Sequence, residues 1–458
     1  MAPSAAGKAR EDAVDLICAV NRGRDPALLR RKFTAMAADP FVFLRATAML
    51  GHRAIDLAAL PRTPLGWVCG DLHLQNFGCF RGGNRLVYFD LNDFDEAARL
   101  PLCVDLLRFL ASVQTAAPGM RIGQTQSHQL LGGALAAYAS ALARGKAFWL
   151  ERETAAGAIG ALLEQVGTRK RRDLLAARTH VAANRRHISV DGQRYLGVAA
   201  DAPVRQQIAG ALQQLAQLYA TATFFELRDI AFRVAGMGSL GVPRYVALVR
   251  GKGDPDRNAL IDFKLAVPSS AVQAMPQFMQ PAWADEAARI VAIQDACQAA
   301  SPACLSAVSL GAAPYVVREL QPVEDRVALA PLARQRKSLA HTLDAMARLA
   351  AYAQLRSAGR LGAAGIDEIM AFGRQMLDRP APWIDAARAI DAANTAAHRY
   401  FANAWRDHDP RLLALCNAAG SAAPSVKMAR RPGPAARVQK PQPAGVARPL
   451  RRRRKEAA

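Results

Sequence analysis

The chain has 458 residues, of which 51% are hydrophobic, so it is long enough and apolar enough for two or three lobes with substantial cores. It carries a formal net charge of +22, and its seven cysteines are scattered without C-x-x-C pairs, so neither a zinc site nor a disulfide framework is indicated and a reducing compartment is favoured. No apolar signal core follows Met1, and charges interrupt the apolar stretches before the roughly eighteen residues that a membrane span requires. We therefore expect a cytoplasmic protein without a transmembrane segment.

The first informative segment is a loop that follows a short apolar run ending at Cys69. Gly70 opens the loop and places Asp71 directly after the run, and Asn76 comes five residues later. His73 lies between them and is the one histidine of the chain that stands inside a motif. The pattern predicts a strand followed by a tight loop that carries an acid, an imidazole and an amide.

A predicted β-hairpin follows this loop. The residues Arg81-Gly-Gly-Asn84 are typical of a hairpin turn, and the apolar run at 86–89 then ends on Asp90. A hairpin of this register brings Asp71, Asn76 and Asp90 together at one end. Such a set of carboxylate and amide oxygens suits Mg²⁺ and phosphate chemistry. The alternative is a solvated acidic hairpin in which the same residues only form turns.

Helical periodicity dominates much of the remaining chain. A helix is expected to follow the hairpin, and its Asp105 either braces the Asp71 loop or lies on the surface. Alanine-rich stretches with helical apolar spacing predict a mainly helical large lobe; they are 130–142, 209–219, 339–355 and 386–402.

A second motif, G-x-G-S-x-G, lies far downstream. Its residues are Gly236, Gly238, Ser239 and Gly241, and the run 245–249 that follows is typical of a strand. A dinucleotide fingerprint would open a helix at this point, so strand, glycine-rich turn and strand favour a loop that covers phosphates.

A third strand is predicted after a turn-rich linker, and it carries one lysine, Lys264, among apolar residues. Beside a loop that covers phosphates, such a lysine can contact those phosphates, and a glutamate on a helix can hold it. Glu286, which begins a helical stretch, is the candidate partner, and 314–320 is the next strand. The alternative for Lys264 is an edge-strand lysine that prevents aggregation.

The segments G-D-L-H-L-Q-N-F-G and F-D-L-N-D-F-D-E resemble the catalytic segment of the protein-kinase-like superfamily, especially its aminoglycoside-phosphotransferase branch. The chain also closely resembles the DUF2252 family of uncharacterised bacterial proteins, over roughly 30–415. The resemblance implies that Asp71 is the catalytic aspartate, with His73 beside it, and that Asn76 and Asp90 bind metal. Asp93 competes with Asp90 for the metal role. The resemblance also implies that the nucleotide is bound by the glycine-rich loop and by Lys264 with Glu286. The loop residues are Gly236, Gly238, Ser239 and Gly241.

The order of the motifs departs from the ordinary kinase pattern, because the glycine-rich loop and the lysine follow the catalytic aspartate. The expected fold is therefore α+β and two-lobed, with a mainly helical large lobe and a small antiparallel-sheet lobe, circularly permuted in chain order unless one motif is fortuitous. The expected segments are 1–29, an N-terminal helical extension; 30–219, the large-lobe part with the catalytic loop; 220–322, the small nucleotide-binding lobe; 323–420, the helical completion of the large lobe; and 421–458, a disordered basic tail.

The resemblance implies a phosphotransferase that uses ATP and Mg²⁺ and acts on a hydroxyl of a small molecule or of a protein. Two alternatives stay open. One is a nucleotide-binding regulator that transfers nothing, similar to a pseudokinase. The other is a nucleic-acid-associated protein, because eleven lysines and arginines lie between Lys427 and Lys455 and favour weak contact with nucleic acid or anionic surfaces.

Overall fold

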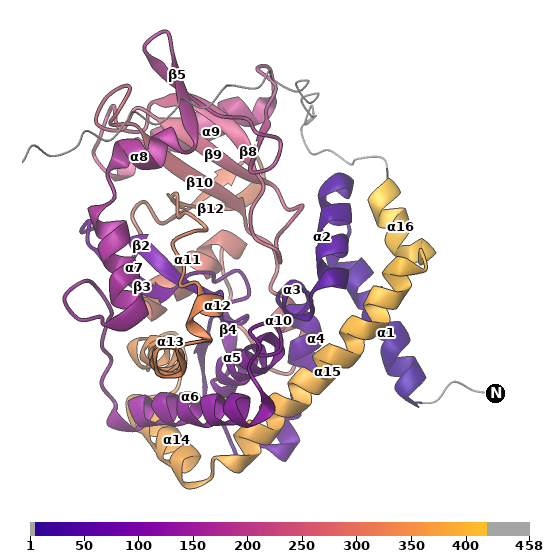
Figure 1. Ribbon diagram of the computed structural model, residues 1–458. Coiled ribbons are helices and arrows are strands. Elements are labelled where there is room, and N and C mark those ends of the chain that lie inside the picture. The colour runs from indigo at the N-terminus through magenta and orange to yellow at the C-terminus, as the bar shows by residue number, and fades with distance from the viewer. Residues whose placement is uncertain (1–4, 419–458) are drawn as a thin grey trace, which may run out of the picture.

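The computed structural model describes residues 5–418 and shows an α+β protein, which confirms the expected class (Figure 1). The helices are α1 (Ala5–Asn21), α2 (Pro26–Ala38), α3 (Pro40–Ala46), α4 (Ala48–Arg53), α5 (Cys103–Ala116), α6 (Gln124–Arg144), α7 (Gly157–Thr168), α8 (Arg171–Ala176), α9 (Pro203–Leu218), α10 (Ser270–Ala274), α11 (Glu286–Cys297), α12 (Leu329–Leu332), α13 (Arg336–Arg356), α14 (Ile366–Asp378), α15 (Ala381–Arg406) and α16 (Pro410–Asn417). The strands are β1 (Leu65–Val68), β2 (Phe77–Arg81), β3 (Val87–Leu91), β4 (Ala98–Pro101), β5 (Thr179–Ala182), β6 (Arg185–Ile188), β7 (Tyr195–Gly197), β8 (Leu227–Arg233), β9 (Arg244–Val249), β10 (Ala259–Leu265), β11 (Ser306–Leu310) and β12 (Ala313–Glu319).

A six-stranded antiparallel sheet with the order β11-β12-β10-β9-β8-β7 forms the upper part of the molecule in Figure 1. Side chains alternate between its faces, as the two-residue period of a strand requires. Tyr245, Ala247 and Val249 of β9 belong to the apolar cluster that includes α9. Val246 and Leu248 belong to a separate cluster with residues of α8 and β6. Both faces are covered, which explains why the whole of β9 is buried.

Charged residues are buried within this sheet. Lys264 of β10 pairs in register with Arg244 of β9, and Asp262 pairs with Arg318 of β12. Arg233, at the end of β8, lies 2.8 Å from Asp262, which is 1% exposed. The end of the sheet that carries Lys264 is thus built from mutually neutralising charges.

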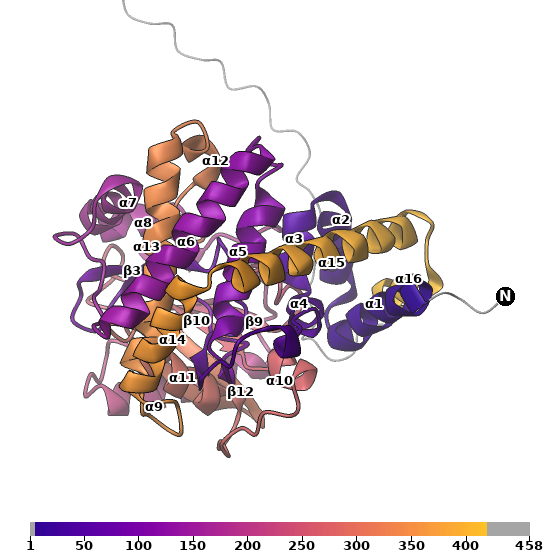
Figure 2. The ribbon, with the colours of Figure 1, turned by 90° about the horizontal axis from the view of Figure 1, so that it is seen from below.

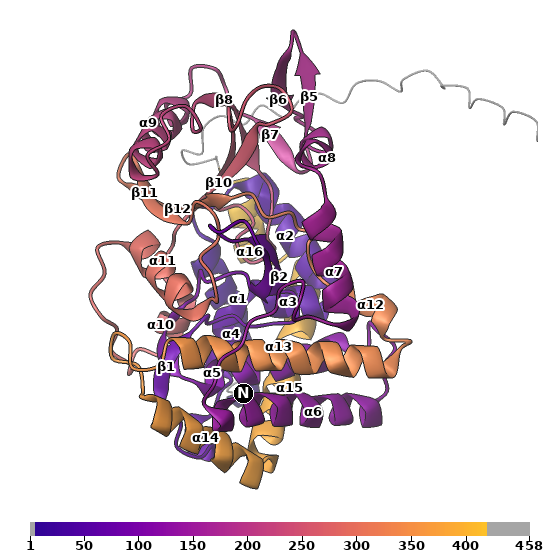
Figure 3. The ribbon, with the colours of Figure 1, turned by 90° about the vertical axis from the view of Figure 1, so that its left-hand side faces the viewer.

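The helical part of the molecule packs around the short strands β1 to β4. The helices α5, α6, α7, α11, α13, α14 and α15 contribute to one large apolar core together with these strands. Figure 3 shows α13 and α6 lying along each other at the base of the molecule. The expected mainly helical lobe is therefore present, with the β2–β3 hairpin embedded in it.

The N-terminal helices form a third cluster with the last helices of the described chain. Asp25 and Asp39 cap α2 and α3, and each is followed by a proline at the first helical position. Figure 2 shows the long helix α15 running from α14 to these helices. Phe401 of α15 packs against Phe33 and Phe43, with ring centroids 5.8 and 5.5 Å apart.

Two of the expected segment boundaries fall inside packed units. The boundary at 29/30 lies within α2, and the boundary at 219/220 separates α9 from the sheet on which it packs. The boundary at 322/323 falls between β12 and α12.

The basic tail at 421–458 lies outside the described residues, so its disorder and its contacts with anionic partners stay predictions. Within 5–418, no helix combines the length and the apolar character that crossing a membrane demands.

Helices α6 and α14 approach so closely at Gly373 that no side chain fits there. A Cβ at this position would lie 2.5 Å from the backbone nitrogen of Ala143 and 2.7 Å from the carbonyl oxygen of Ala139. We expect Gly373→Ala to lower the free energy of unfolding by about 1–3 kcal/mol, because the helices must separate. The matched control is Gly132→Ala, at an exposed position of α6 where a Cβ meets open space, and it should raise the free energy of unfolding by about 0.5–1 kcal/mol. Urea unfolding followed by circular dichroism measures both, and stabilisation by both variants would contradict the close crossing.

Candidate active site

The loop that carries Asp71 is held in place by Asp105 of α5. The Asp105 carboxylate accepts hydrogen bonds from the backbone N–H groups of Cys69, at 2.8 Å, and Gly70, at 3.0 Å. Burial raises the pKa of Asp105 to about 6. Gly70 has a φ of +85°, and a Cβ there would lie 2.0 Å from the carbonyl oxygen of Glu96. Of the two alternatives for Asp105, the brace is therefore the one observed.

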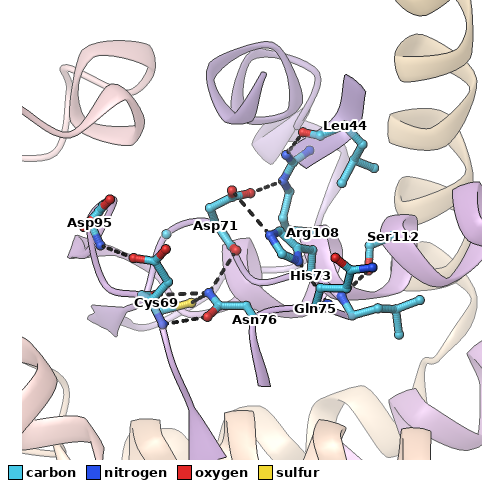
Figure 4. A network of polar contacts seen from close by, with 12 residues as sticks. Leu44, Cys69, Asp71, His73, Gln75, Asn76, Asp95, Arg108 and Ser112 are labelled. Atoms are coloured by element: carbon cyan, nitrogen blue, oxygen red, sulfur yellow. Dashed lines mark hydrogen bonds and ion pairs between the residues drawn. The ribbon is translucent and has the colours of Figure 1, made fainter. Parts of the chain in front are cut away.

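Asp71 lies at the centre of the polar network in Figure 4. Its Oδ1 accepts a hydrogen bond from Nε of the buried Arg108, at 2.9 Å, and Arg108 also donates to the carbonyl oxygen of Leu44. Gly51 makes room for this guanidinium, since a Cβ there would lie 2.3 Å from Arg108 Nη1. Burial raises the pKa of Asp71, and the charge of Arg108 opposes this rise. Arg108 therefore orients one carboxylate oxygen and leaves Oδ2 available for other contacts.

His73 lies beside Asp71 as a neutral imidazole. Its Nδ1 accepts a hydrogen bond from the backbone N–H of Gln75 at 3.1 Å, so the ring proton is on Nε2, which is 3.9 Å from Asp71 Oδ2. Burial lowers the pKa of His73 well below its usual value, and the charges of Arg45 and Arg108 act in the same direction. The ring therefore presents a donor to Asp71 and carries no charge of its own.

Asn76 ties the Asp71 loop to the segment after β3. Its side-chain nitrogen donates to the carbonyl oxygens of Asp71, at 3.1 Å, and Asp93, at 3.0 Å. Its oxygen accepts the backbone N–H groups of Asp93, at 2.7 Å, and Asn92, at 3.3 Å. The amide that was expected to bind metal is thus fully engaged in holding two loops together.

Lys264 extends from the sheet to the segment after β3. Its Nζ lies 3.1 Å from Asp93 Oδ1 and also forms an ion pair with Asp95. Although burial alone would raise it, the charges of Lys264 and Arg318 hold the pKa of Asp93 well below its usual range. Burial and the neighbouring Asp93 raise the pKa of Asp95. Two carboxylates of unequal acidity therefore share one ammonium group.

The structure places two of the expected site residues elsewhere. Asp90 is 1% exposed, forms a 2.9 Å ion pair with Arg356 of α13 and does not line the cavity described below. Glu286, at the start of α11, pairs with Arg289 of the same helix at 2.6 Å. Within 5–418 it makes no ion pair with Lys264, so the expected pair of Lys264 and Glu286 does not form. Of the two candidates for a metal carboxylate, Asp93 is the one at the cavity.

A cavity of about 550 Å³ lies between the Asp71 loop and the glycine-rich loop. The glycine-rich loop connects β8 to β9 as expected, and it contributes Gly236, Gly238, Ser239 and Gly241 to the lining. The Asp71 loop and the segment after β3 contribute Asp71, His73, Asn76, Asp93, Asp95 and Glu96. The two motifs, which are far apart in the sequence, therefore share one cavity.

The N-terminal helices hold the glycine-rich loop from the outside. Arg24 donates to the carbonyl oxygens of Gly238, at 2.6 Å, and Leu240, at 3.2 Å, and Lys32 donates to Gly238 at 2.8 Å. The backbone N–H of Asp25 donates to the carbonyl oxygen of Gly241 at 3.2 Å. The region between α1 and α2 thus forms one wall of the cavity.

Sequence reasoning missed several residues of this cavity. Asp95 belongs to the F-D-L-N-D-F-D-E segment, and its position two residues after Asp93 could have identified it as a candidate site residue. Arg24, Arg45 and Arg326 also line the cavity. They come from three separate parts of the chain, and no local pattern distinguishes them from the many other arginines.

Together, these features define an α+β protein in which the Asp71 loop and a glycine-rich loop meet at a polar, arginine-rich cavity. Residues 24–404 match the family model described as "Uncharacterized protein conserved in bacteria (DUF2252)". The chain therefore belongs to the DUF2252 family. Comparison with curated proteins and with solved structures finds no match.

Proposed function

We propose that this chain is an ATP- and Mg²⁺-dependent phosphotransferase with a kinase-like arrangement, acting on a hydroxyl of a small molecule. The observation that carries the proposal is the meeting of the Asp71 loop and the glycine-rich loop at one cavity. Its volume of about 550 Å³ is in the range of small-molecule sites. The unusual order of the motifs does not oppose this reading, because a site depends on which segments meet in space.

The nucleotide side of the proposed site is the edge of the sheet. The loop between β8 and β9 has positive φ angles at Gly236, +80°, and Gly241, +88°, which only glycine adopts without strain. Backbone N–H groups of such a loop can cover phosphate oxygens, and a lysine on the third strand of the sheet can contact them. Lys264 on β10 is next to β9; it does not itself line the cavity, but its ammonium contacts Asp93, which does.

Mg²⁺ fits this site only together with a nucleotide. The residues in 5–418 contain no cluster of three or more acidic, histidine or cysteine side chains that could hold a metal alone. Mg²⁺, however, is usually bound by one or two carboxylates plus substrate phosphates. Asp93 and Asp95 line the cavity and would supply these carboxylates once phosphates compete for Lys264. Bound there, the ion would neutralise charge on the transferred group.

Asp71 is proposed to accept the proton of the acceptor hydroxyl. The acceptor oxygen attacks the γ-phosphorus as the bond to the ADP oxygen breaks, and the hydroxyl proton passes to Asp71 Oδ2. Arg108 fixes the other oxygen, and the neutral His73 donates toward the same carboxylate. Catalysis of this kind consists mostly of positioning and charge neutralisation.

A nucleotide-binding regulator that transfers nothing is the second candidate. The observation that favours it is the absence of a Lys264–Glu286 ion pair within the described residues, since active protein kinases need the corresponding pair in place. Binding of ATP without release or transfer of phosphate would distinguish it.

A thermal-shift experiment on the full chain tests the proposal. ATP with Mg²⁺, at about a hundred times its dissociation constant, should stabilise the protein by about 2.7 kcal/mol. This gain should need Mg²⁺ and should disappear in Asp93→Asn, because Asp93 is one of the two cavity carboxylates proposed to bind the ion and, unlike Asp90, lines the cavity. The matched control is Asp90→Asn, which lowers the starting stability by breaking the pair with Arg356 but should retain the ligand-dependent gain.

The two aspartates separate the possible failures of this experiment. Loss of the gain in Asp90→Asn with retention in Asp93→Asn would move the metal role to Asp90. No gain for the unaltered chain at millimolar ATP would refute nucleotide binding and with it the proposed function.

A further inference from the structure

The cavity contains more positive charge than its own carboxylates neutralise. Arg22, Arg24, Arg45, Arg53 and Arg326 all line it, and none forms an ion pair with a carboxylate anywhere in 5–418. The carboxylates there have other partners: Asp71 pairs with Arg108, Asp93 and Asp95 share Lys264, and Glu96 accepts hydrogen bonds from the Ser269 hydroxyl and the backbone N–H of Ala271. Arg22 and Arg53 are exposed at the rim, where they would attract anions from solution.

Arg45 and Arg326 stand out among these arginines. Each is half-buried, each has a buried Nε without a partner, and neither guanidinium donates a hydrogen bond to any described residue. Burial lowers the pKa of Arg326 to about 10, and the nearby charge of Arg45 adds to this effect. A half-buried cation without an acceptor is costly for the protein alone, and an anionic ligand would remove the cost.

The two guanidiniums lie near the Asp71 loop, and the backbone of Arg45 also adjoins the glycine-rich loop, because a Cβ at Gly238 would lie 3.2 Å from the Arg45 carbonyl oxygen. Both charges act on the ring of His73, and the charge of Arg45 also acts on Asp71. Arg326 lies beside Gly78 of β2, because a Cβ there would be 3.3 Å from its Cγ. Arg24, by contrast, is committed to the carbonyl oxygens of the glycine-rich loop. The unpaired arginines are therefore close to the group that would receive the acceptor proton.

We propose that the acceptor is a phosphate-bearing small molecule whose phosphate is bound by Arg45 and Arg326, an inference that rests on the proposed phosphotransferase function. A phosphate carries about two negative charges at pH 7, which matches two guanidiniums that lack a hydrogen-bond acceptor and a carboxylate partner in 5–418, although that of Arg45 lies 6.0 Å from the centroid of the Phe41 ring. The planar fork of arginine suits the phosphate oxygens. The same charges oppose a polycationic acceptor such as an aminoglycoside. The proposed phosphate-bearing acceptor thus differs from the aminoglycosides for which the branch that the sequence resembles is named.

Titration of inorganic phosphate tests this proposal, with the full chain held in a complex with Mg²⁺ and a non-hydrolysable ATP analogue. Calorimetry should show phosphate binding to the complex, weakened about tenfold or more in Arg45→Gln and in Arg326→Gln. Neither side chain has a hydrogen-bond partner within 5–418, so both variants should fold. The matched control is Arg334→Gln, an exposed arginine outside the cavity, which should bind phosphate unchanged.

Other outcomes overturn the proposal in distinguishable ways. Displacement of the analogue by phosphate would assign both arginines to the nucleotide's own phosphates. Equal binding of acetate at matched ionic strength would indicate a carboxylate-bearing acceptor instead. No phosphate binding by the analogue complex would refute the acceptor class alone, whereas an analogue that fails to bind with Mg²⁺ would refute the phosphotransferase function and the acceptor class with it.

Discussion

Asp71→Asn is expected to lower the rate of ATP hydrolysis by about 10²–10⁴-fold, the usual contribution of a positioned acid or base. Asparagine can still accept the hydrogen bond from Arg108 through its side-chain oxygen, but it cannot take a proton from a hydroxyl or from water. Binding of ATP with Mg²⁺ should be retained, because the proposed nucleotide contacts are Lys264, Asp93 and the glycine-rich loop. Phosphate release, measured at saturating ATP, checks the rate.

The matched control for this variant is Asp201→Asn, an exposed aspartate outside the cavity that should leave the rate unchanged. A melting curve for each variant separates loss of turnover from loss of folding. Turnover that survives in Asp71→Asn at about the rate of the unaltered chain would remove Asp71 from the chemistry and leave Asp95 and Glu96 as the remaining candidates.

Asp262→Asn is expected to lower the free energy of unfolding by about 3–5 kcal/mol, the usual result of breaking a buried ion pair from one side. Asp262 lies 2.8 Å from Arg233 Nη1 and 3.0 Å from Arg244 Nε, and all three residues are buried. Removing the one carboxylate between them leaves two buried cations without a counter-charge. Chemical denaturation measures the difference.

The control for this prediction is Asp385→Asn on α15. Asp385 is 72% exposed and lies 3.7 Å from Arg388, so its loss should change stability by no more than about 1 kcal/mol. Equal effects of the two substitutions would show that the buried charges of the sheet contribute no more than a solvated pair.

The same carboxylate predicts how stability depends on pH. Although burial alone would raise it, the guanidiniums of Arg233 and Arg244 hold the pKa of Asp262 well below its usual range. In the unfolded chain the group takes up a proton near its ordinary pKa of about 3.9, while in the folded chain it stays ionised. The stabilisation is therefore complete above about pH 4 and is lost as the pH falls further. The acid-induced loss of stability should be smaller in Asp262→Asn.

The parts of the fold that sequence predicted well are those in which neighbouring residues determine the structure. The β2–β3 hairpin follows from a turn between two apolar runs, and the glycine-rich loop follows from glycines between two strands. The segment boundary at 219/220 falls between α9 and the sheet on which α9 packs, because the helical period of α9 is the same whether the helix packs on a sheet or on other helices. What a helix packs against is not visible in its own sequence.

The candidate site shows the same division between local and distant information. Asp71 and the glycine-rich loop were found from spacing, and they share the cavity. The choice between Asp90 and Asp93 depended on Arg356, which lies in a helix far along the chain and takes Asp90 away from the cavity. Arg45 and Arg326 belong to no motif, so only the folded chain identifies them as cavity residues.

The contacts that hold the glycine-rich loop depend on residues from both ends of the described chain. Arg24 and Lys32, which hold that loop, belong to a helical cluster whose core is completed by Phe401 of α15 and Leu412 of α16. Asp15 and Arg411 join α1 to α16 directly, at 3.1 Å. A nascent chain in which the Asp71 loop and the glycine-rich loop have already been synthesised therefore still lacks α15 and α16, on which the helices that contact the glycine-rich loop pack. We therefore expect the glycine-rich loop to be held in its final position only after the last helices have been made.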